Sequence, residues 1–281
     1  MASNNLKFFD QKTILKKLVN NSFRALDEGH YEIQKDVNFD NHTTIDLKKK
    51  LIECSHVPLI TEIKFASPSH GTILNTNDVK LEAIVTEMEK AHSCGISILT
   101  QPYLFNGSIE FVIKSRKKTF LPILMKDIIV SDVQIKTAKK IGADCILLIK
   151  TIFDKDMAEG SLEKFCEYAK KIGLQVIVET HFQKEFEEII KSNKKNYQLC
   201  DIVGINNRNL DTLDVDLETT KKILSSSDKN NNVILSESGI HSKDNIKYLK
   251  KYGADAFLIG TSLMRNINTL GKEINEFYYT Y

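Results

Sequence analysis

The chain has 281 residues, 42% of them hydrophobic, which is enough to form the core of one large α/β domain or of two small ones. Its 39 basic and 37 acidic residues leave a formal charge of +2, which gives no indication of nucleic acid or an anionic membrane as a partner. No run of about 18 apolar residues occurs, so we expect a soluble protein without a membrane span.

The cysteines indicate a reducing compartment. They are odd in number and scattered, with neither a C-x-x-C pair nor a histidine at metal-ligand spacing: Cys54, Cys94, Cys145, Cys166 and Cys200. The N-terminus lacks the charged start, apolar stretch and cleavage site of a signal peptide. We therefore expect a cytoplasmic protein with free thiols, and no metal or organic cofactor is indicated.

Residues 1–57 predict a helical N-terminal extension packed on the rest of the chain. Lys12–Phe23 has apolar residues at helical spacing, and Ile45–Cys54 has the pattern of a second, short helix. From Pro58 onward the pattern becomes regular, because short apolar runs alternate with longer amphipathic ones. Residues 58–281 are therefore expected to form a regular α/β domain.

Eight apolar runs predict strands, at Leu59–Lys64, Ile96–Thr100, Pro122–Lys126, Cys145–Lys150, Gln175–Glu179, Ile202–Asn206, Val233–Ser236 and Ala256–Gly260. Helical patterns follow them in turn, at Asp78–Cys94, Ser108–Lys117, Ser131–Ile141, Ser161–Ile172, Gln183–Lys191, Leu217–Ser225, Ser242–Tyr252 and Leu270–Phe277. Eight strand–helix units predict a parallel sheet closed into a (β/α)8 TIM barrel. An open doubly wound sheet is the alternative, but no G-x-G-x-x-G follows the first strand.

Polar side chains gather at the carboxyl ends of these strands, where barrel enzymes place their active sites. In the first strand, side-chain alternation places Glu62 and Lys64 on the same face as Ile60. By the same alternation, the later strands present Lys126, Glu179, Asn206, Ser236 and Ser238. A satisfied structural ion pair or hydrogen bond is the alternative for each group taken singly. Their shared position and phase favour a site in which lysine donates a proton and a carboxylate accepts one.

Small residues in the loops after the last two strands predict an anion site. Ser236–Ile240 and Gly260–Met264 allow backbone N–H groups to approach a phosphate closely, as such loops do in many barrels, and Ser67 in the first loop adds a hydroxyl. Ordinary capping of helices by Ser and Thr is the alternative explanation for these residues.

At these residues the sequence resembles indole-3-glycerol-phosphate synthase, a barrel enzyme of tryptophan biosynthesis. The segments that carry the resemblance are EIKFASPS at Glu62–Ser69, LTQPYLFNGS at Leu99–Ser108, ILMKDIIVSDVQI at Ile123–Ile135, GADCILLI at Gly142–Ile149, VGINNRNLDTLDVDL at Val203–Leu217, SESGI at Ser236–Ile240 and FLIGTSLMR at Phe257–Arg265. Their order and spacing cover most of the chain from Leu59 to Arg265.

The resemblance implies a carbon–carbon carboxy-lyase that closes a ring on 1-(2-carboxyphenylamino)-1-deoxyribulose 5-phosphate with loss of CO2 and water. By position, Lys126 would be the general acid, Lys64 would bind the anthranilate carboxylate and share acid duty, and Glu179 would be the general base. The orienting groups would be Glu62 and Asn206. Ser238 completes the catalytic set.

The resemblance also implies the binding residues. The phosphate positions fall on Ser67, Ser238, Gly239, Gly260 and Thr261. The positions around the aromatic ring and the glycerol chain fall on Phe105, Leu147, Ile149, Arg208 and Leu210. The implied partners are a small phosphorylated substrate and, transiently, other tryptophan-pathway enzymes.

Two competing functions belong to different classes. A sister barrel of the phosphoribosylanthranilate isomerase type would need an acid–base pair of Cys and Asp at strand ends, where this chain has Lys64, Lys126 and Glu179. A degenerate barrel that only binds a phosphate ester would be expected to have lost a proton-transfer residue, and all of them are present.

Overall fold

The computed structural model describes residues 9–10, 12–34, 37, 39, 41–69, 71–75, 80–194, 198–265 and 267–278. The start of one predicted helix, at Asp78, lies outside these residues.

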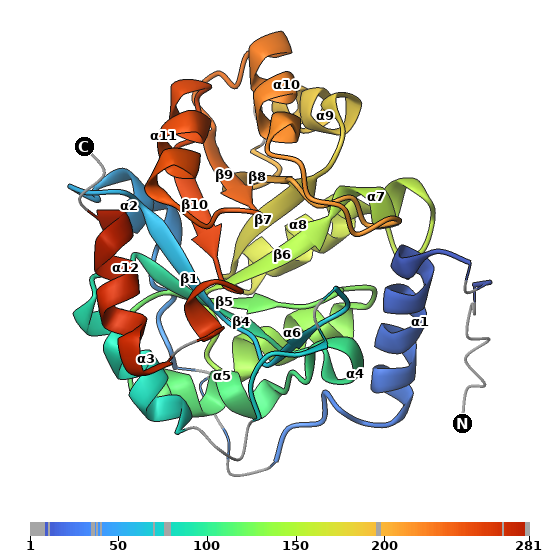
Figure 1. Cartoon of the computed structure of the whole chain (residues 1–281). Helices are drawn as coiled ribbons and strands as arrows, with labels where there is room; N and C mark the ends of the chain where they lie inside the picture. The colour runs from blue at the N-terminus through green and yellow to red at the C-terminus, as the bar shows by residue number, and fades with distance from the viewer. Residues whose placement is uncertain are drawn as a thin grey trace.

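Eight parallel strands close into a barrel in the order β1-β10-β9-β8-β7-β6-β5-β4 (Figure 1). They are β1 (Leu59–Ile63), β4 (Gly95–Leu99), β5 (Ile123–Lys126), β6 (Cys145–Ile149), β7 (Gln175–Thr180), β8 (Ile202–Asn206), β9 (Val233–Glu237) and β10 (Ala256–Ile259). Each coincides with a predicted strand to within two residues at either end. The predicted TIM barrel is confirmed, and the open doubly wound sheet is wrong because β1 pairs with both β4 and β10. A small antiparallel hairpin, β2 (Ala66–Ser67) and β3 (Gly71–Thr72), follows β1.

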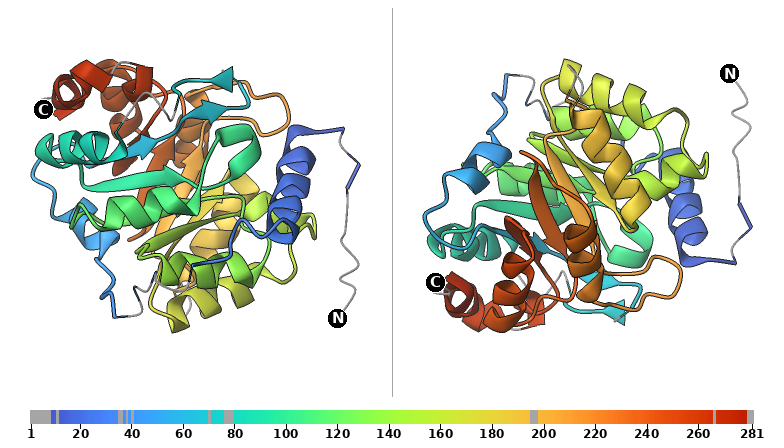
Figure 2. Two further views of the ribbon diagram at one scale, coloured as in Figure 1. Left: turned by 90° about the horizontal axis from the view of Figure 1, so that it is seen from below. Right: turned by 90° about the horizontal axis from the view of Figure 1, so that it is seen from above.

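Helices surround the strands (Figure 2). They are α1 (Ile14–Asp27), α2 (Leu47–Ile52), α3 (Leu81–Lys90), α4 (Pro102–Phe105), α5 (Ile109–Arg116), α6 (Asp132–Lys140), α7 (Lys150–Asp154), α8 (Leu162–Lys171), α9 (Gln183–Lys194), α10 (Glu218–Ser226), α11 (Lys243–Lys251) and α12 (Leu270–Tyr278). Several begin after a serine whose side chain accepts a backbone N–H of the first turn: Ser108, Ser131, Ser161 and Ser242. These serines mark the predicted helix starts because a capping hydroxyl replaces a missing backbone acceptor.

The helices differ from the prediction in several respects. Helix α1 continues beyond Phe23 to Asp27, and α9 continues beyond Lys191 to Lys194. The helix predicted to reach Cys94 ends at Lys90, because His92 takes a left-handed backbone conformation with φ of 60°. The short helices α4 and α7 were not predicted, since four or five residues carry too little periodicity to be recognised.

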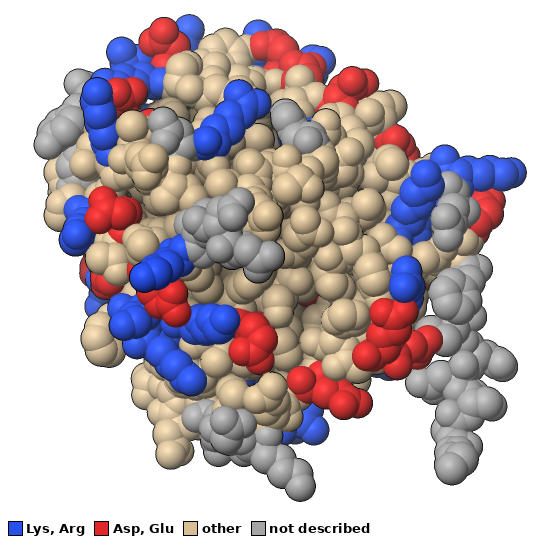
Figure 3. Space-filling model, turned by 60° about the horizontal axis from the view of Figure 1, so that its bottom comes forward, with Lys and Arg blue, Asp and Glu red and all other residues tan. Residues whose placement is uncertain are grey.

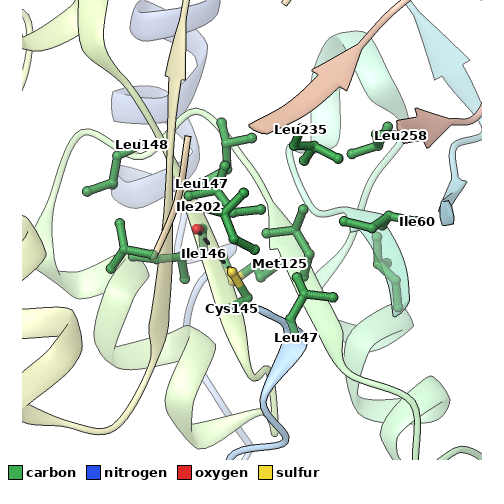
Figure 4. Packing of buried hydrophobic residues seen from close by; sticks show 14 of the residues in the cluster. Leu47, Ile60, Met125, Cys145, Ile146, Leu147, Leu148, Ile202, Leu235 and Leu258 are labelled. Carbon is green, nitrogen blue, oxygen red and sulfur yellow. Dashed lines mark hydrogen bonds between the residues drawn. The ribbon is translucent and has the colours of Figure 1, made fainter. Parts of the chain in front are cut away.

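The strands are buried on both faces, as expected of a parallel sheet covered by helices. Figure 4 shows part of this core, with Ile60, Leu147, Ile202 and Leu258 from different strands. Leu47 of α2 belongs to the same packing and is fully buried. A Cβ added to Gly95, at the start of β4, would lie 2.7 Å from Leu47 Cδ1.

The residues before β1 reach both ends of the barrel. At the amino ends of the strands, the Leu47 N–H donates to Gln175 Oε1 over 2.6 Å, which fixes α2 to the first residue of β7. Near the carboxyl ends, α1 packs against α4, the helix that follows β4. In Figures 1 and 2, α1 and α2 accordingly stand on opposite sides of the barrel.

Aspartates at the starts of alternate strands tie neighbouring strands together. Asp144, Asp201 and Asp255 each accept a backbone N–H from the preceding strand, at distances of 2.7–2.8 Å. Asp144 is fully buried and also accepts from Arg116 Nη1 over 2.8 Å. Its other oxygen contacts His42 Nε2 and the Ile45 N–H, both over 2.7 Å. Asp144 therefore joins two strands, α5 and the N-terminal extension.

The surface and the thiols agree with the composition. On the face drawn in Figure 3, basic and acidic side chains lie around a largely uncharged centre. The five cysteines, all within the described residues, are free. In the part of the chain that the structure describes, no helix has the length and apolarity needed to cross a membrane.

Asp144→Asn tests the tie at the amino ends. The substitution leaves the buried guanidinium of Arg116 without its charge partner, so we expect the free energy of unfolding to fall by about 3–5 kcal/mol. Asp255→Asn is the matched control, because Asp255 makes the same strand contact but pairs with the partly exposed Lys229; a loss of about 1 kcal/mol is expected there. Urea unfolding measures both. Equal losses in the two variants would contradict a special role for Asp144.

Candidate active site

A cavity of about 400 Å³ opens at the carboxyl ends of the strands. Its lining includes every residue that the family resemblance implies for the site: Glu62, Lys64, Ser67, Phe105, Lys126, Leu147, Ile149, Glu179, Asn206, Arg208, Leu210, Ser238, Gly239, Gly260 and Thr261. Residues from nearly all of the strands and the loops that follow them therefore converge on one space.

Lys126 lies at the centre of a buried charge cluster. Its ammonium group is 2.5 Å from Glu237 Oε2 and 3.6 Å from Glu62 Oε2. The other oxygen of Glu62 lies 2.7 Å from Lys64 Nζ. Ser97 Oγ completes the environment of Glu62 at 3.4 Å. Strands β1, β5 and β9 thus contribute to one continuous network of alternating charges.

The sequence analysis missed Glu237, which is fully buried and is the nearest partner of Lys126. Ser236 was assigned to the inner face of its strand, and this is wrong. The Ser236 hydroxyl instead contacts Asn207 and Thr220 outside the barrel lumen. The strand is buried on both faces, so hydrophobic alternation gave no phase. The sequence did contain a signal for Glu237, because an acidic residue at the end of a buried strand needs a charged partner and is therefore a candidate site residue.

The cluster separates the proton affinities of its members. Burial opposes the charge on Lys126, but Glu237, Glu62 and Glu179 together raise its pKa above the usual lysine value. Burial raises the pKa of Glu237 to about 7, against the opposing effect of Lys126. Burial also acts to raise the pKa of Glu62, yet the charges of Lys64 and Lys126 lower it overall. Near neutral pH the site therefore holds a protonated lysine beside carboxylates of differing basicity.

Glu179 lies at the end of β7, in the phase predicted, and is 2% exposed. Burial acts to raise its pKa, but His181, Lys126 and Asn206 together bring the pKa down to about 2. His181 is a second group that sequence reasoning missed. Its Nε2 lies 3.2 Å from Glu179 Oε1.

The loops after β9 and β10 form the small-residue end of the cavity. Ser238 has a left-handed backbone with φ of 67°, and Gly239 follows with φ of 79°. Helix capping does not explain Ser238, because Ser242 caps α11. Gly260 is required by close packing, since an added Cβ would lie 2.6 Å from Glu62 Oε1.

The remaining wall is apolar and partly closed by the N-terminal extension. Phe105, Leu147, Ile149 and Leu210 line it together with Leu18 of α1, which the sequence analysis did not include. Arg208 Nη1 donates to the Leu213 carbonyl over 2.9 Å and so braces the loop after β8. The cavity can thus hold an aromatic group against the wall, an anion at the small-residue loops and a proton donor between them.

Comparisons with known proteins match most of the chain to one family. A family model described as indole-3-glycerol phosphate synthase matches residues 15–277. The chain is 38% identical over 244 residues to the indole-3-glycerol phosphate synthase of Methanocaldococcus jannaschii, covering 86% of each chain. It is 40% identical over 220 residues to that of Campylobacter fetus, covering 78% of this chain and 80% of the relative.

Solved structures resemble the chain in fold alone. A mutant tryptophan synthase alpha-subunit from Pyrococcus furiosus matches with a TM-score of 0.57 at 14% identity, covering 78% of this chain and 97% of the other. Thiamine phosphate pyrophosphorylase from the same organism matches with a TM-score of 0.55 at 17% identity, covering 83% and 96%.

Gly260→Ala tests the packing between β10 and the charge cluster. The new methyl group must displace Glu62, so we expect a loss of about 1–3 kcal/mol in the free energy of unfolding. Gly271→Ala in α12 is the control, because its methyl group would meet only the end of the Glu87 side chain, at 3.0 Å. That variant should be neutral or more stable by up to about 1 kcal/mol. If both variants unfold at the same urea concentration, Glu62 is not held by Gly260.

Proposed function

The chain belongs to the indole-3-glycerol phosphate synthase family, and on this premise we propose how its own residues convert 1-(2-carboxyphenylamino)-1-deoxyribulose 5-phosphate into indole-3-glycerol phosphate, CO2 and water. The observation that carries the proposal is Lys126, a lysine held as ammonium between Glu237 and Glu62 beside an apolar wall. A proton donor of this kind is what closure of the ring requires.

Ring closure begins with proton transfer from Lys126 to the ketone oxygen of the ribulose chain. The ring carbon that bears the carboxylate then attacks the ketone carbon, so a carbon–carbon bond forms and the ketone oxygen becomes a hydroxyl group. Lys64, 2.7 Å from Glu62, binds the carboxylate and holds the ring in line. Loss of CO2 returns the bonding electrons to the ring.

Dehydration follows on the same face. Lys64 supplies the proton with which the hydroxyl group leaves as water, and Glu179 removes a proton from the new five-membered ring to complete the indole. Asn206, which lowers the pKa of Glu179, orients the base and the substrate hydroxyl groups. Ser238 lines the small-residue end of the cavity and contacts the substrate phosphate there.

Phosphate binding positions the substrate. Ser67, Gly239, Gly260 and Thr261 lie at one end of the cavity, where backbone N–H groups can surround an anion. Phe105, Leu147, Ile149, Arg208 and Leu210 take the aromatic ring and the glycerol chain. Fixing both ends of the substrate brings the reacting atoms together. In well-oriented reactions this effect can lower the activation barrier by about 7 kcal/mol.

Glu237 acts through Lys126 in this scheme. It lies at 2.5 Å from the ammonium group and its own pKa is raised to about 7 by burial. It therefore holds Lys126 in place and is able to return a proton to it after the first transfer.

The wider assignment follows from this chemistry. Loss of CO2 with formation of a carbon–carbon bond places the enzyme among the carbon–carbon carboxy-lyases, as EC 4.1.1.48. We place it in the cytoplasm, a compartment in keeping with its free cysteines, with transient contacts to other enzymes of tryptophan biosynthesis. The two domains, 1–57 and 58–281, are proposed to act together, since Leu18 borders the cavity.

Lys126→Ala tests the assigned acid. The chain contains no tryptophan, so the indole fluorescence of the product can be followed directly when the substrate is added. The wild type should give a rising signal, and the variant should lose at least about tenfold in kcat, equivalent to ~1.4 kcal/mol of barrier. Lys150→Ala is the matched control, because Lys150 is also a lysine paired with two carboxylates but does not line the active-site cavity.

The control should keep wild-type kcat. A loss of less than tenfold in Lys126→Ala would mean that another group is the acid. Absence of product with the wild type, while the substrate still binds, would instead point to a barrel that only binds its ligand.

A further inference from the structure

A second cavity, of about 570 Å³, lies beside the active-site cavity. The residues that border both cavities are Asn206, Arg208, Leu210 and Asp214. Glu179 lines the active-site cavity and His181 lines the second one. The contact between Glu179 and His181 therefore crosses the wall between the two spaces.

His181 is buried but poorly satisfied. Its residue is 8% exposed, and neither ring nitrogen has a hydrogen bond of good geometry within the described residues. Nε2 nevertheless lies 3.2 Å from Glu179 Oε1, an ion-pair distance. A buried imidazole with no hydrogen bond is costly. Its proximity to the carboxylate indicates that a charge interaction compensates this cost.

The surroundings of the ring are acidic on several sides. The charges of Glu179 on β7, Glu185 on α9 and Glu237 on β9 act on it. The other charged residues that line the second cavity are of both signs: Lys155, Arg208, Lys222, Asp211, Asp214 and Asp216. The Glu185 carboxylate also accepts the His181 backbone N–H over 2.7 Å and the Thr151 hydroxyl over 2.6 Å, which anchors this part of the chain. Burial disfavours a charged imidazole, but the carboxylates together raise the pKa of His181 above its usual value.

We propose that His181 is a positioning residue for the general base: its imidazolium holds the Glu179 carboxylate ionised and oriented, and the second cavity gives the ring its exchange with solvent protons. The inference rests on the role proposed above for Glu179. His181 lies outside the active-site cavity, yet it affects the ionisation of Glu179 inside that cavity.

The sign of the pH dependence follows from the contact. An imidazolium beside Glu179 favours the carboxylate, so the base stays ionised to lower pH than it would alone. Lys126 and Asn206 act on Glu179 in the same direction and remain in place when His181 is replaced. Removing the imidazolium should therefore move the acid limb of kcat to higher pH without abolishing it.

His181→Gln tests the proposal in the full-length enzyme, with kcat and KM measured against pH by indole fluorescence. We expect the pH at which kcat falls on the acid side to be at least one unit higher in the variant, with KM little changed. The matched control is His42→Gln, which removes a comparable histidine–carboxylate contact, 2.7 Å from Asp144, at the opposite end of the barrel. Its acid limb should remain at the wild-type position. An unchanged limb in His181→Gln, even with lower stability, would overturn the proposal.

Infrared titration keeps the test independent of turnover. The infrared band of the protonated Glu179 carboxyl group is identified by its loss in Glu179→Gln. The pH at which this band appears on acidification is then compared between the wild type and His181→Gln. The proposal expects the band to appear at higher pH in the variant, and onset at the same pH would overturn it. If the wild type gave no indole product, the proposed function would fail, while this titration would still decide the coupling of His181 to Glu179.

Discussion

The burial of Lys126 between Glu237 and Glu62 is the constraint on which the rest of the site depends. Two carboxylates and an ammonium group withdrawn from water are costly unless each is paired, and pairing here requires β1, β5 and β9 to face one lumen. The closed barrel satisfies that requirement. Glycines make the necessary room, since a Cβ at Gly204 would lie 2.7 Å from Glu237 Oε1.

The two ends of the barrel have different roles. Contacts at the amino ends stabilise the fold, and groups at the carboxyl ends form the candidate active site. At the amino ends, Asp144 and Leu47 bind the N-terminal extension to the strands. At the carboxyl ends, Lys126 pairs with Glu62 and Glu237 beside an open cavity, and Leu18 of the same extension borders that cavity. Barrel enzymes commonly separate these tasks in this way. The extension therefore stabilises one end while it completes the wall of the other.

Sequence reasoning predicted the barrel because alternating apolar and amphipathic runs have clear periods. It predicted Lys126 and Glu179 because each is the only charged residue of its predicted strand. It failed where those signals vanish. β9 is buried on both faces, so Ser236 was placed inward in place of Glu237. His181 follows the end of β7, beyond the reach of strand alternation. Glu179 and His181 are only two positions apart, but the predicted strand ended at Glu179, so its phase was not extended to His181.

The protonation state of Lys126 tests this account most directly. A 15N NMR titration of the Lys126 side chain, assigned by its loss in Lys126→Ala, would follow the ammonium group from neutral to alkaline pH. The account predicts that Lys126 remains protonated well beyond the usual lysine pKa of about 10.4, because Glu237 and Glu62 stabilise its charge. Titration at or below the ordinary lysine value would contradict it, since burial would then offset or outweigh the two carboxylates.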